Sequence, residues 1–260
     1  MTDKKMKTAL ITGASEGIGQ ELSRIFAREG YDVVLVARNK EKLDKLGAEL
    51  TQSYGTEATV VSKDLSVRTA PEEIFKELEG KGVSVHTLVN NAGYTVYGAF
   101  AEADFADQEK MLDVLVYAPT RLTSVFVPGM VERGEGQILN LASTGSYVPC
   151  PYEAVYAASK AYVLFFSEAI SEELAGSNVI VTALCPGATR TQFFERSSTQ
   201  NFRVFEIGMM SPEQVAEIGY RALVAGKRSV VAGIMNKALV GSARVTPHRL
   251  LCKLVGSAIS

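Results

Sequence analysis

Short β-branched segments alternate with longer segments of helical periodicity almost to the end of this chain, and this order limits the possible folds more than any other feature. The segments that predict buried strands are Lys7–Thr12, Asp32–Ala37, Ala58–Ser62, Val85–Asn90, Gln137–Ala142, Val179–Leu184 and Ser229–Ala232. The segments that predict helices between them include Ile18–Glu29, Lys40–Ser53, Ala70–Glu79, Gln108–Glu132 and Ala154–Ala175. Right-handed crossovers between parallel strands place helices on both faces of a sheet. The sequence therefore predicts an α/β fold with a doubly wound parallel sheet.

The chain shows no internal repeat, low-complexity tract or linker rich in Pro, Gly and Ser at which it would divide. Its 260 residues, 47% of them hydrophobic, are enough to form one complete core. We therefore expect a single domain over residues 1–260.

Composition argues against several classes of protein. A formal net charge of -2 provides no field that attracts nucleic acid. Cys150, Cys185 and Cys252 form no CxxC pair and leave one cysteine over under any pairing, which is typical of a reducing cytosol. Neither His86 nor His248 has a Cys or His neighbour at ligand spacing, so no metal site is predicted. No signal-like stretch precedes the first glycines, and no run approaches the roughly 20 apolar residues of a membrane span, so we expect a cytoplasmic protein.

Residues 189–210 are rich in Phe and Met and show no clean periodicity. A helix is predicted to start after them, with Ser211 as its N-cap and Pro212 at its first position. In a doubly wound fold, a segment that follows the carboxyl end of a strand lies over the ligand crevice. Because long loops in compact domains are usually functional, we interpret 189–210 as a substrate loop. A packed surface excursion is the alternative.

The first predicted strand runs into a glycine-rich turn that precedes a helix. The turn, 12–19, reads TGASEGIG, which has GxxxGxG spacing and not the GxGxxG of the general dinucleotide fingerprint. Glycines there allow a tight turn and let backbone N–H groups approach a pyrophosphate at the helix N-terminus. A purely conformational role is the alternative, but the position in an alternating chain favours dinucleotide binding. The predicted cofactor contacts are Gly13, Ser15, Glu16, Gly17, Ile18 and Gly19.

The residues after the second predicted strand bear on the choice of nicotinamide cofactor. An acidic residue there binds the ribose hydroxyls of NAD and repels a 2′-phosphate. This chain has Arg38 and Asn39 instead, and the Arg38 guanidinium can hold a phosphate through a bidentate fork. A plain surface arginine is the alternative, and the Glu16 carboxylate near the expected phosphate opposes phosphate binding. We predict NADP, with NAD less favoured, and Arg38 and Asn39 as cofactor contacts.

Tyr156 and Lys160 form a YxxxK pattern inside the predicted helix Ala154–Ala175, one turn apart on one face. A tyrosine is a poor acid at neutral pH because its unperturbed pKa is about 10, and a neighbouring ammonium stabilises the phenolate and lowers that pKa. YxxxK occurs by chance in chains of this length. Ser143, thirteen residues earlier at the end of a predicted strand, strengthens it, since its hydroxyl can hydrogen-bond a substrate oxygen. Ser143, Tyr156 and Lys160 are therefore the predicted catalytic residues, with Tyr156 as the proton donor to a carbonyl.

Several motifs occur in the order and spacing of one known family. They are the TGASEGIG loop, Asp64-Leu65, Asn90-Asn91-Ala92-Gly93, Ser143, Tyr156-Ala157-Ala158-Ser159-Lys160 and Pro186-Gly187. As a set they are highly specific, and from about Lys7 to Val231 the chain resembles a classical short-chain dehydrogenase/reductase. The resemblance implies a Rossmann-type fold with a seven-stranded sheet, and hydride transfer between NAD(P) and an alcohol or carbonyl.

The resemblance also implies roles for individual residues. Asp64 and Leu65 would lie beside the adenine, and Asn90, Ala92 and Gly93 would line the cofactor cleft. Pro186, Gly187, Thr189 and Thr191 would hold the carboxamide and phosphates, and Lys160 would also bond the nicotinamide ribose. The family commonly forms dimers or tetramers through two long helices, which correspond to Gln108–Glu132 and Ala154–Ala175 in this chain, so a homo-oligomer is expected.

One position departs from the family pattern. The family usually has an asparagine in the helix after NNAG, where it bends the helix and anchors a water in the proton relay. Aligning Met111–Val116 with that motif puts Leu115 at the asparagine. A leucine cannot hydrogen-bond that water, and we expect that it does not open the helix. The sequence therefore predicts a stable protein that binds its cofactor but turns over slowly.

The stretch Val179–Phe194 is similar to the branch that contains hydroxysteroid and long-chain 3-oxoacyl reductases. Beside Ser143, the candidate substrate contacts are apolar or aromatic, as a lipophilic ligand requires, and comprise Tyr94, Val96, Val148, Tyr152, Phe193, Phe194 and Phe202. Packing in the core or at a subunit interface is the alternative for several of them.

Two hypotheses of different classes follow. The leading one is an NADP-dependent reductase of an apolar ketone or aldehyde. The second is a catalytically weak NADP-binding sensor or interaction protein, motivated by Leu115. The C-terminal tail, 245–260, raises a third possibility, because Val245–Ile259 can form a short basic amphipathic helix at a lipid surface. Docking of this tail on a partner subunit is the favoured interpretation.

Overall fold

The computed structural model describes residues 7–191 and 208–258. Its centre is a seven-stranded parallel sheet with the strand order β3-β2-β1-β4-β5-β6-β7. The strands are β1 (Thr8–Thr12), β2 (Asp32–Ala37), β3 (Ala58–Ser62), β4 (Val85–Asn90), β5 (Gly136–Leu141), β6 (Val179–Cys185) and β7 (Ser229–Val231). The predicted Rossmann-type α/β fold is confirmed, and each predicted strand end lies within one residue of the observed one.

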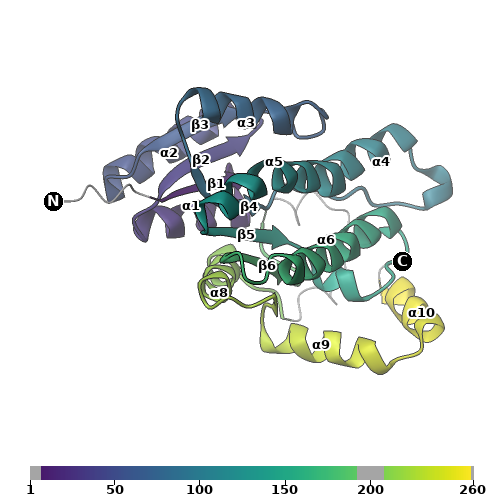
Figure 1. Cartoon of the computed structure of the whole chain (residues 1–260). Coiled ribbons are helices and arrows are strands. Elements are labelled where there is room, and N and C mark those ends of the chain that lie inside the picture. The colour runs from purple at the N-terminus through teal and green to yellow at the C-terminus, as the bar shows by residue number, and fades with distance from the viewer. Residues whose placement is uncertain (1–6, 192–207, 259–260) are drawn as a thin grey trace.

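Helices cover both faces of the sheet (Figure 1). They are α1 (Gly17–Arg28), α2 (Lys40–Tyr54), α3 (Ala70–Gly80), α4 (Phe105–Leu112), α5 (Ala118–Arg133), α6 (Ala154–Glu173), α8 (Pro212–Val224), α9 (Ile234–Val245) and α10 (His248–Ala258). Two short 3-10 turns, η1 (Phe100–Glu102) and η3 (Thr144–Tyr147), and a π-helical segment, η2 (Asp113–Tyr117), complete the described elements.

The core consists of two main apolar layers, one on each face of the sheet. Successive strand residues point to opposite faces, so Ile11 packs with α1, α2 and α8 while its neighbour Leu10 packs with α3 and α5. Each face contributes a large, fully buried side chain from a helix, Phe26 on one side and Ile74 on the other. Strands buried on both faces explain why the sequence showed continuous β-branched runs without alternation.

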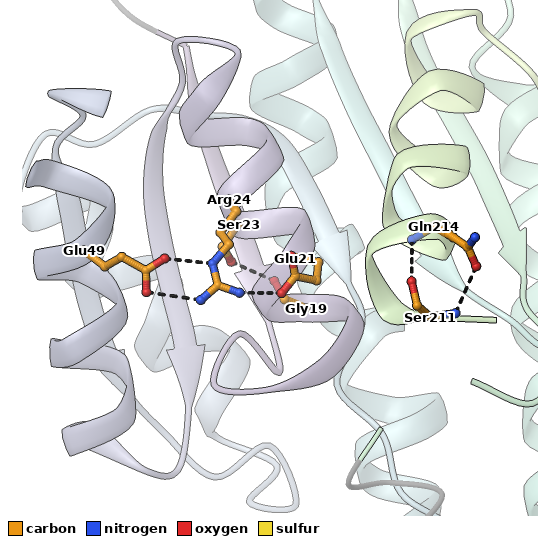
Figure 2. Close-up of polar contacts among 7 residues, drawn as sticks. All are labelled: Gly19, Glu21, Ser23, Arg24, Glu49, Ser211 and Gln214. Atoms are coloured by element: carbon orange, nitrogen blue, oxygen red, sulfur yellow. Dashed lines mark hydrogen bonds and ion pairs between the residues drawn. The ribbon is translucent and has the colours of Figure 1, made fainter. Parts of the chain in front are cut away.

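Polar contacts fix the helices that frame the glycine loop (Figure 2). Arg24 of α1 donates to both carboxylate oxygens of Glu49 on α2, at 2.8 and 3.1 Å, and also pairs with Glu21. This fork raises the pKa of Arg24 and lowers the pKa of Glu49. On the neighbouring helix α8, the predicted N-cap is confirmed: the Ser211 hydroxyl accepts from the backbone N–H of Gln214, and the Gln214 side chain accepts from the Ser211 N–H.

The helix predicted over Gln108–Glu132 is longer and not uniform. Elements α4, η2 and α5 run in line as one rod beside α6 (Figure 1), and the middle part is π-helical. The expectation that Leu115 keeps this helix closed is therefore wrong. Pro119 gives the physical reason, because it has no N–H to donate to the Leu115 carbonyl four residues earlier and its ring clashes with that carbonyl. The Ala118 N–H accordingly donates to Asp113, five residues back.

The same rod, Phe105–Arg133, is long enough to cross a membrane and contains an 18-residue window with a mean hydropathy of 1.3, and it is the single such span in the described ranges. The sequence analysis expected no span of this kind. Leu122, Phe126 and Met130 of the rod are buried against the sheet, which is the arrangement of a core helix in a globular protein.

Candidate active site

A cavity of about 940 Å³ lies along the carboxyl edge of the sheet. The residues that follow successive strands meet there: Gly13 after β1, Arg38 after β2, Ala92 after β4, Ser143 after β5 and Pro186 after β6. This edge, where the order of the strands reverses between β1 and β4, is the usual ligand site of doubly wound sheets. The fold therefore brings motifs that are far apart in the sequence to one cavity.

The glycine loop forms one wall of the cavity. Gly13 and Gly17 adopt φ angles of +67° and +60°, which favour glycine. Gly19 lies outside the cavity lining, and a Cβ there would collide with the Gly13 carbonyl and the Asn91 side chain. Asn91, which the sequence analysis gave no role, donates from Nδ2 to the Thr12 carbonyl at 2.8 Å and so fastens the loop to the end of β4.

The end of the cavity near β2 is rich in cations. Arg38 is exposed, lines the cavity and forms no ion pair among the residues described. Lys42, which also lines the cavity, contacts Glu16 through an Nζ–Oε2 distance of 2.9 Å and neutralises the charge that opposed phosphate binding. Asn39 lines the cavity too, but its Oδ1 accepts from the Lys42 backbone N–H and caps α2.

The other residues that the glycine loop and the family resemblance assigned to the cofactor mostly line the same cavity. These are Ser15, Ile18, Asp64, Leu65, Ala92, Gly93, Pro186, Gly187, Thr189 and Thr191. Asp64 is also used structurally, since its Oδ1 accepts from the backbone N–H of Ser66 at 2.9 Å and from its hydroxyl at 2.8 Å. Lys63 and Lys110 line the cavity without having been predicted, because no motif marks them.

Ser143, Tyr156 and Lys160 converge in the middle of the cavity. Ser143 caps η3, where its Oγ accepts from the Gly145 N–H at 3.0 Å, and its hydroxyl also hydrogen-bonds Tyr156. Lys160 lies one turn after Tyr156 on α6, with its Nζ 5.8 Å from the centre of the Tyr156 ring. The arrangement brings two hydrogen-bonded hydroxyls and one ammonium together on the wall of the cavity.

Burial controls the protonation of this cluster. It lowers the pKa of Lys160 to about 8, the direction expected when an ammonium is removed from water. The pKa of Tyr156 is raised, first by burial and then by the charge of Glu153, while the hydrogen bond with Ser143 lowers it. The sequence analysis expected Lys160 to lower the pKa of Tyr156. The net shift is upward instead, because burial outweighs the hydrogen bond with Ser143.

The Lys160 ammonium is held by backbone and faces a second, much smaller cavity. Its Nζ donates to the Leu141 carbonyl at 2.7 Å, and the Ser146 hydroxyl donates to the Lys160 carbonyl at 2.8 Å. The second cavity, about 10 Å³, has room for about one water and is bordered by Lys160, Leu115 and Asn90. Asn90 therefore shares this second cavity with Lys160 and lies outside the lining of the main cavity.

A chain of hydrogen bonds fixes the orientation of the Asn90 amide. Ser167 donates to the Val163 carbonyl at 2.6 Å, so its oxygen accepts from Asn140 Nδ2 at 2.9 Å. Asn140 Oδ1 in turn accepts from Asn90 Nδ2 at 2.8 Å. The remaining atom, Asn90 Oδ1, is buried and has no hydrogen-bond partner within the described residues.

The opposite end of the cavity is mostly apolar and comes largely from the C-terminal helices. Val148 lines it as predicted. Tyr94 also lines the cavity, but within electrostatic reach of Arg38 and Asp64, and Tyr152 lies outside the lining and stacks on Tyr97 with ring centroids 5.8 Å apart. Val96 is also outside the lining, and Phe193, Phe194 and Phe202 fall outside the described residues. Helices α9 and α10 contribute side chains that no sequence motif indicated: Leu239, Val240, Ser242, Ala243, Leu251 and Val255.

A carboxylate stands out in this apolar region. Glu153, one turn before Tyr156, accepts from the Thr95 hydroxyl at 2.8 Å, and both residues line the cavity. Burial raises the pKa of Glu153. Beyond the effect of burial, the charge of Glu153 in turn raises the pKa of Tyr156. Burial, followed by the charge of Glu153, raises the pKa of Cys150 to about 12. Sequence inspection missed Glu153 because a single glutamate at a helix start is usually a solvated surface residue.

Comparison with known proteins agrees with this geometry. Residues 7–201 match the family model for short chain dehydrogenase. A very-long-chain 3-oxoacyl-CoA reductase from Anas platyrhynchos is 34% identical over 184 residues, which cover 68% of this chain and 58% of that protein. The matched region thus spans less than two thirds of the length of that relative.

Solved structures are similar over almost the whole chain. A structure of 7β-hydroxysteroid dehydrogenase superposes with a TM-score of 0.87 at 26% identity and covers 96% of both chains. A short-chain dehydrogenase from Sphingobium yanoikuyae in complex with NADPH gives a TM-score of 0.81 at 30% identity and covers 92% of this chain and 94% of that one.

Proposed function

Because the chain belongs to the short-chain dehydrogenase family, we propose that it reduces an apolar ketone or aldehyde with NADPH, or runs the reverse oxidation with NADP. The observation that carries the proposal is the convergence of Ser143, Tyr156 and Lys160 in one cavity with the glycine loop. In reduction, Tyr156 gives its proton to the carbonyl oxygen, and Ser143 hydrogen-bonds the same oxygen as negative charge develops on it. Bound NADPH supplies the hydride that the carbonyl carbon accepts.

The residues at the β1–β2 edge fit a dinucleotide that carries a 2′-phosphate. Positive φ at Gly13 and Gly17 lets the backbone approach a pyrophosphate at the N-terminus of α1. Arg38 is free to pair with the 2′-phosphate, because Glu16 is already neutralised by Lys42. The similarity to an NADPH complex supports NADP over NAD. Lys160 holds the nicotinamide ribose and keeps positive charge beside Tyr156.

The proposed substrate is lipophilic and carries its carbonyl near one end. Val148, Val240, Leu251 and Val255 give the cavity an apolar wall beyond Ser143 and Tyr156, suited to a hydrocarbon body. The names of similar proteins, a hydroxysteroid dehydrogenase and a very-long-chain 3-oxoacyl-CoA reductase, belong to enzymes of lipophilic substrates.

We also propose a homo-oligomer through the long helices. The outer face of α6 exposes Phe165 by 66% and Tyr162 by 40%, and α4 exposes Phe105 by 67%. Large apolar side chains on the outside of packed helices are typical of subunit contacts.

The alternative is a sensor that binds NADP but turns over little, and it rests on Leu115. A screen of ketones, aldehydes and 3-oxoacyl thioesters, with NADPH and NADH oxidation followed in parallel, separates the two hypotheses. We expect turnover with NADPH on at least one apolar carbonyl. Tight NADPH binding without turnover on any member would favour the sensor, and a preference for NADH would contradict the cofactor assignment.

A further inference from the structure

The last two helices form a cationic unit at one end of an otherwise acidic chain. Ile234–Ala258, here called the C-terminal helix pair, contains four basic residues and no acidic one. Since the whole chain has a formal charge of -2, these four positive charges leave -6 for the rest. Lys237, Arg249 and Lys253 form no ion pair among the residues described, and Arg244 lies over the Tyr147 ring at 5.7 Å. All four are exposed, so the charge is available to a partner.

The helix pair also exposes large aliphatic side chains. Helix α9 buries one narrow stripe, Asn236, Val240 and Ala243. On the opposite side, Ile234, Ala238, Gly241 and Val245 recur at helical spacing and share one face. The two largest of these, Ile234 and Val245, are 84% and 83% exposed.

Helix α10 repeats the pattern of aliphatic and basic residues side by side. Leu250 and Leu254, one turn apart, are 49% and 57% exposed. Arg249 and Lys253, also one turn apart, lie on the adjacent strip of the helix. An aliphatic ridge flanked by Lys and Arg is the arrangement of helices that lie in the interface of an anionic membrane.

We propose that the outer face of the C-terminal helix pair docks this protein on the surface of an anionic lipid bilayer. This face consists of the exposed aliphatic and basic residues Ile234, Lys237, Arg244, Val245, Arg249, Leu250, Lys253 and Leu254. The same face of a second copy fits poorly, because a two-fold contact of this face with itself would set identical cationic surfaces against each other. An acidic protein would satisfy the charges, but protein interfaces are enriched in aromatic anchors and the exposed apolar side chains of this face are aliphatic. Anionic lipid satisfies both the charges and the aliphatic ridge.

The position of the helix pair connects docking to the cavity. Val240 and Ala243 of α9 and Leu251 and Val255 of α10 line the cavity from the inner side of the same two helices (Figure 1, yellow). A docked protein would therefore hold the apolar end of its cavity next to the bilayer, where a lipophilic ligand is concentrated. Docking itself does not depend on turnover, so its test is independent of the proposed reaction.

The test is co-sedimentation of the full-length protein with vesicles of phosphatidylcholine alone and with one third phosphatidylserine. We expect binding to the phosphatidylserine vesicles only, weakening as salt is raised. Each basic residue near such a surface contributes about fivefold to the affinity, so Arg249→Ala with Lys253→Ala should weaken binding about 25-fold. The matched control, Lys45→Ala with Lys76→Ala, removes two exposed lysines from α2 and α3 and should leave binding unchanged.

A second pair of variants tests the aliphatic ridge. Ile234→Ser with Val245→Ser should weaken vesicle binding about tenfold or more, whereas Val67→Ser, at a valine that is 52% exposed far from the helix pair in sequence, should not. Circular dichroism melting confirms that each variant folds. Absence of binding to phosphatidylserine vesicles, or equal loss in the control variants, overturns the proposal. A change of oligomeric state in the Ile234→Ser, Val245→Ser variant, seen by analytical ultracentrifugation, would assign the face to a second copy and also overturn it.

Discussion

The two ends of the cavity are built in different ways. At the β1–β2 end, backbone turns at glycines and a few charged side chains lie at fixed distances from strand ends, and the residues come from short motifs. At the opposite end, the walls are apolar side chains from the segment after η3 and, much later in the sequence, from the consecutive helices α9 and α10. A pyrophosphate has the same shape in every enzyme that binds it, so its site is recognisable from spacing. A hydrophobic body can be enclosed by many combinations of side chains, so its site leaves no motif.

The largest expected effect lies at the junction of the two ends. Tyr156→Phe should lower kcat by roughly 10²–10⁴-fold, the usual contribution of general acid catalysis, and leave NADPH affinity nearly intact. Steady-state rates and NADPH fluorescence titration measure the two quantities. The matched control is Tyr152→Phe, at a tyrosine outside the cavity lining, which should keep its rate. A Tyr156→Phe enzyme with near-normal kcat would remove this residue from the mechanism.

The next effect belongs to the β1–β2 end alone. Arg38→Ala should weaken NADPH binding about ten- to a hundredfold, which corresponds to roughly 1.5–3 kcal/mol for a charge-assisted contact, and should change NADH binding far less. Lys40→Ala, two residues later and paired with Asp44 on the surface, is the control and should affect neither cofactor. Tighter binding of NADH than NADPH by the unmodified protein would contradict the assignment of the 2′-phosphate site.

At the opposite end, removal of one wall residue should affect substrates according to their length. Leu251 is buried and lines the cavity, whereas its neighbour Leu250 is 49% exposed. Leu251→Ala should lower kcat/KM about tenfold for a long apolar ketone, because the lost contact area is worth roughly 1–2 kcal/mol, and should spare a short ketone. Leu250→Ala is the control. Equal losses for short and long ketones would indicate that α10 supports the fold and does not select the substrate.

These predictions also show what the sequence can and cannot supply. The sheet, the glycine loop and the positions of Ser143, Tyr156 and Lys160 follow from periodicity and spacing, and the structure brings these residues together. The Lys42–Glu16 pair and the walls from α9 and α10 could not be predicted, because each depends on which side chains meet across the fold. The π-helical segment was missed although Pro119, inside the predicted helix Gln108–Glu132, marks it, since Leu115 alone was considered as the residue that shapes this helix.

Glu153 should exert a smaller effect that appears in the pH profile. Its charge raises the pKa of Tyr156, so Glu153→Gln should lower that pKa and move the rise of alcohol oxidation, which needs the phenolate, to lower pH. The measurement is kcat for oxidation against pH, beside Thr95→Val, which removes the hydroxyl that donates to Glu153 but keeps the carboxylate. A Glu153→Gln profile that is unchanged, or shifted to higher pH, would show that this carboxylate does not act on Tyr156 during turnover.

The smallest effect is expected at Leu115, where the chain departs from its family. The sequence pattern alone predicts that Leu115→Asn raises kcat about tenfold, by opening the helix and anchoring a water. In the structure Pro119 accounts for the open helix, and the small cavity behind Lys160 already has the unpaired Asn90 Oδ1 on its border. We therefore expect kcat to change less than about threefold, a barrier difference below roughly 0.7 kcal/mol.

Stability should respond more than rate to the same substitution. Leu115 is 1% exposed, and its Cδ2 lies so close to Gly93 that a Cβ there would approach it to 2.9 Å, so an asparagine amide enters a tightly packed apolar site. An unsatisfied amide costs about 1–3 kcal/mol, which should lower the melting temperature by several degrees. Leu115→Met, which conserves volume, is the control and should melt close to the unmodified protein. If a folded Leu115→Asn enzyme gained tenfold in kcat, the missing amide and not the shape of the helix would limit the reaction.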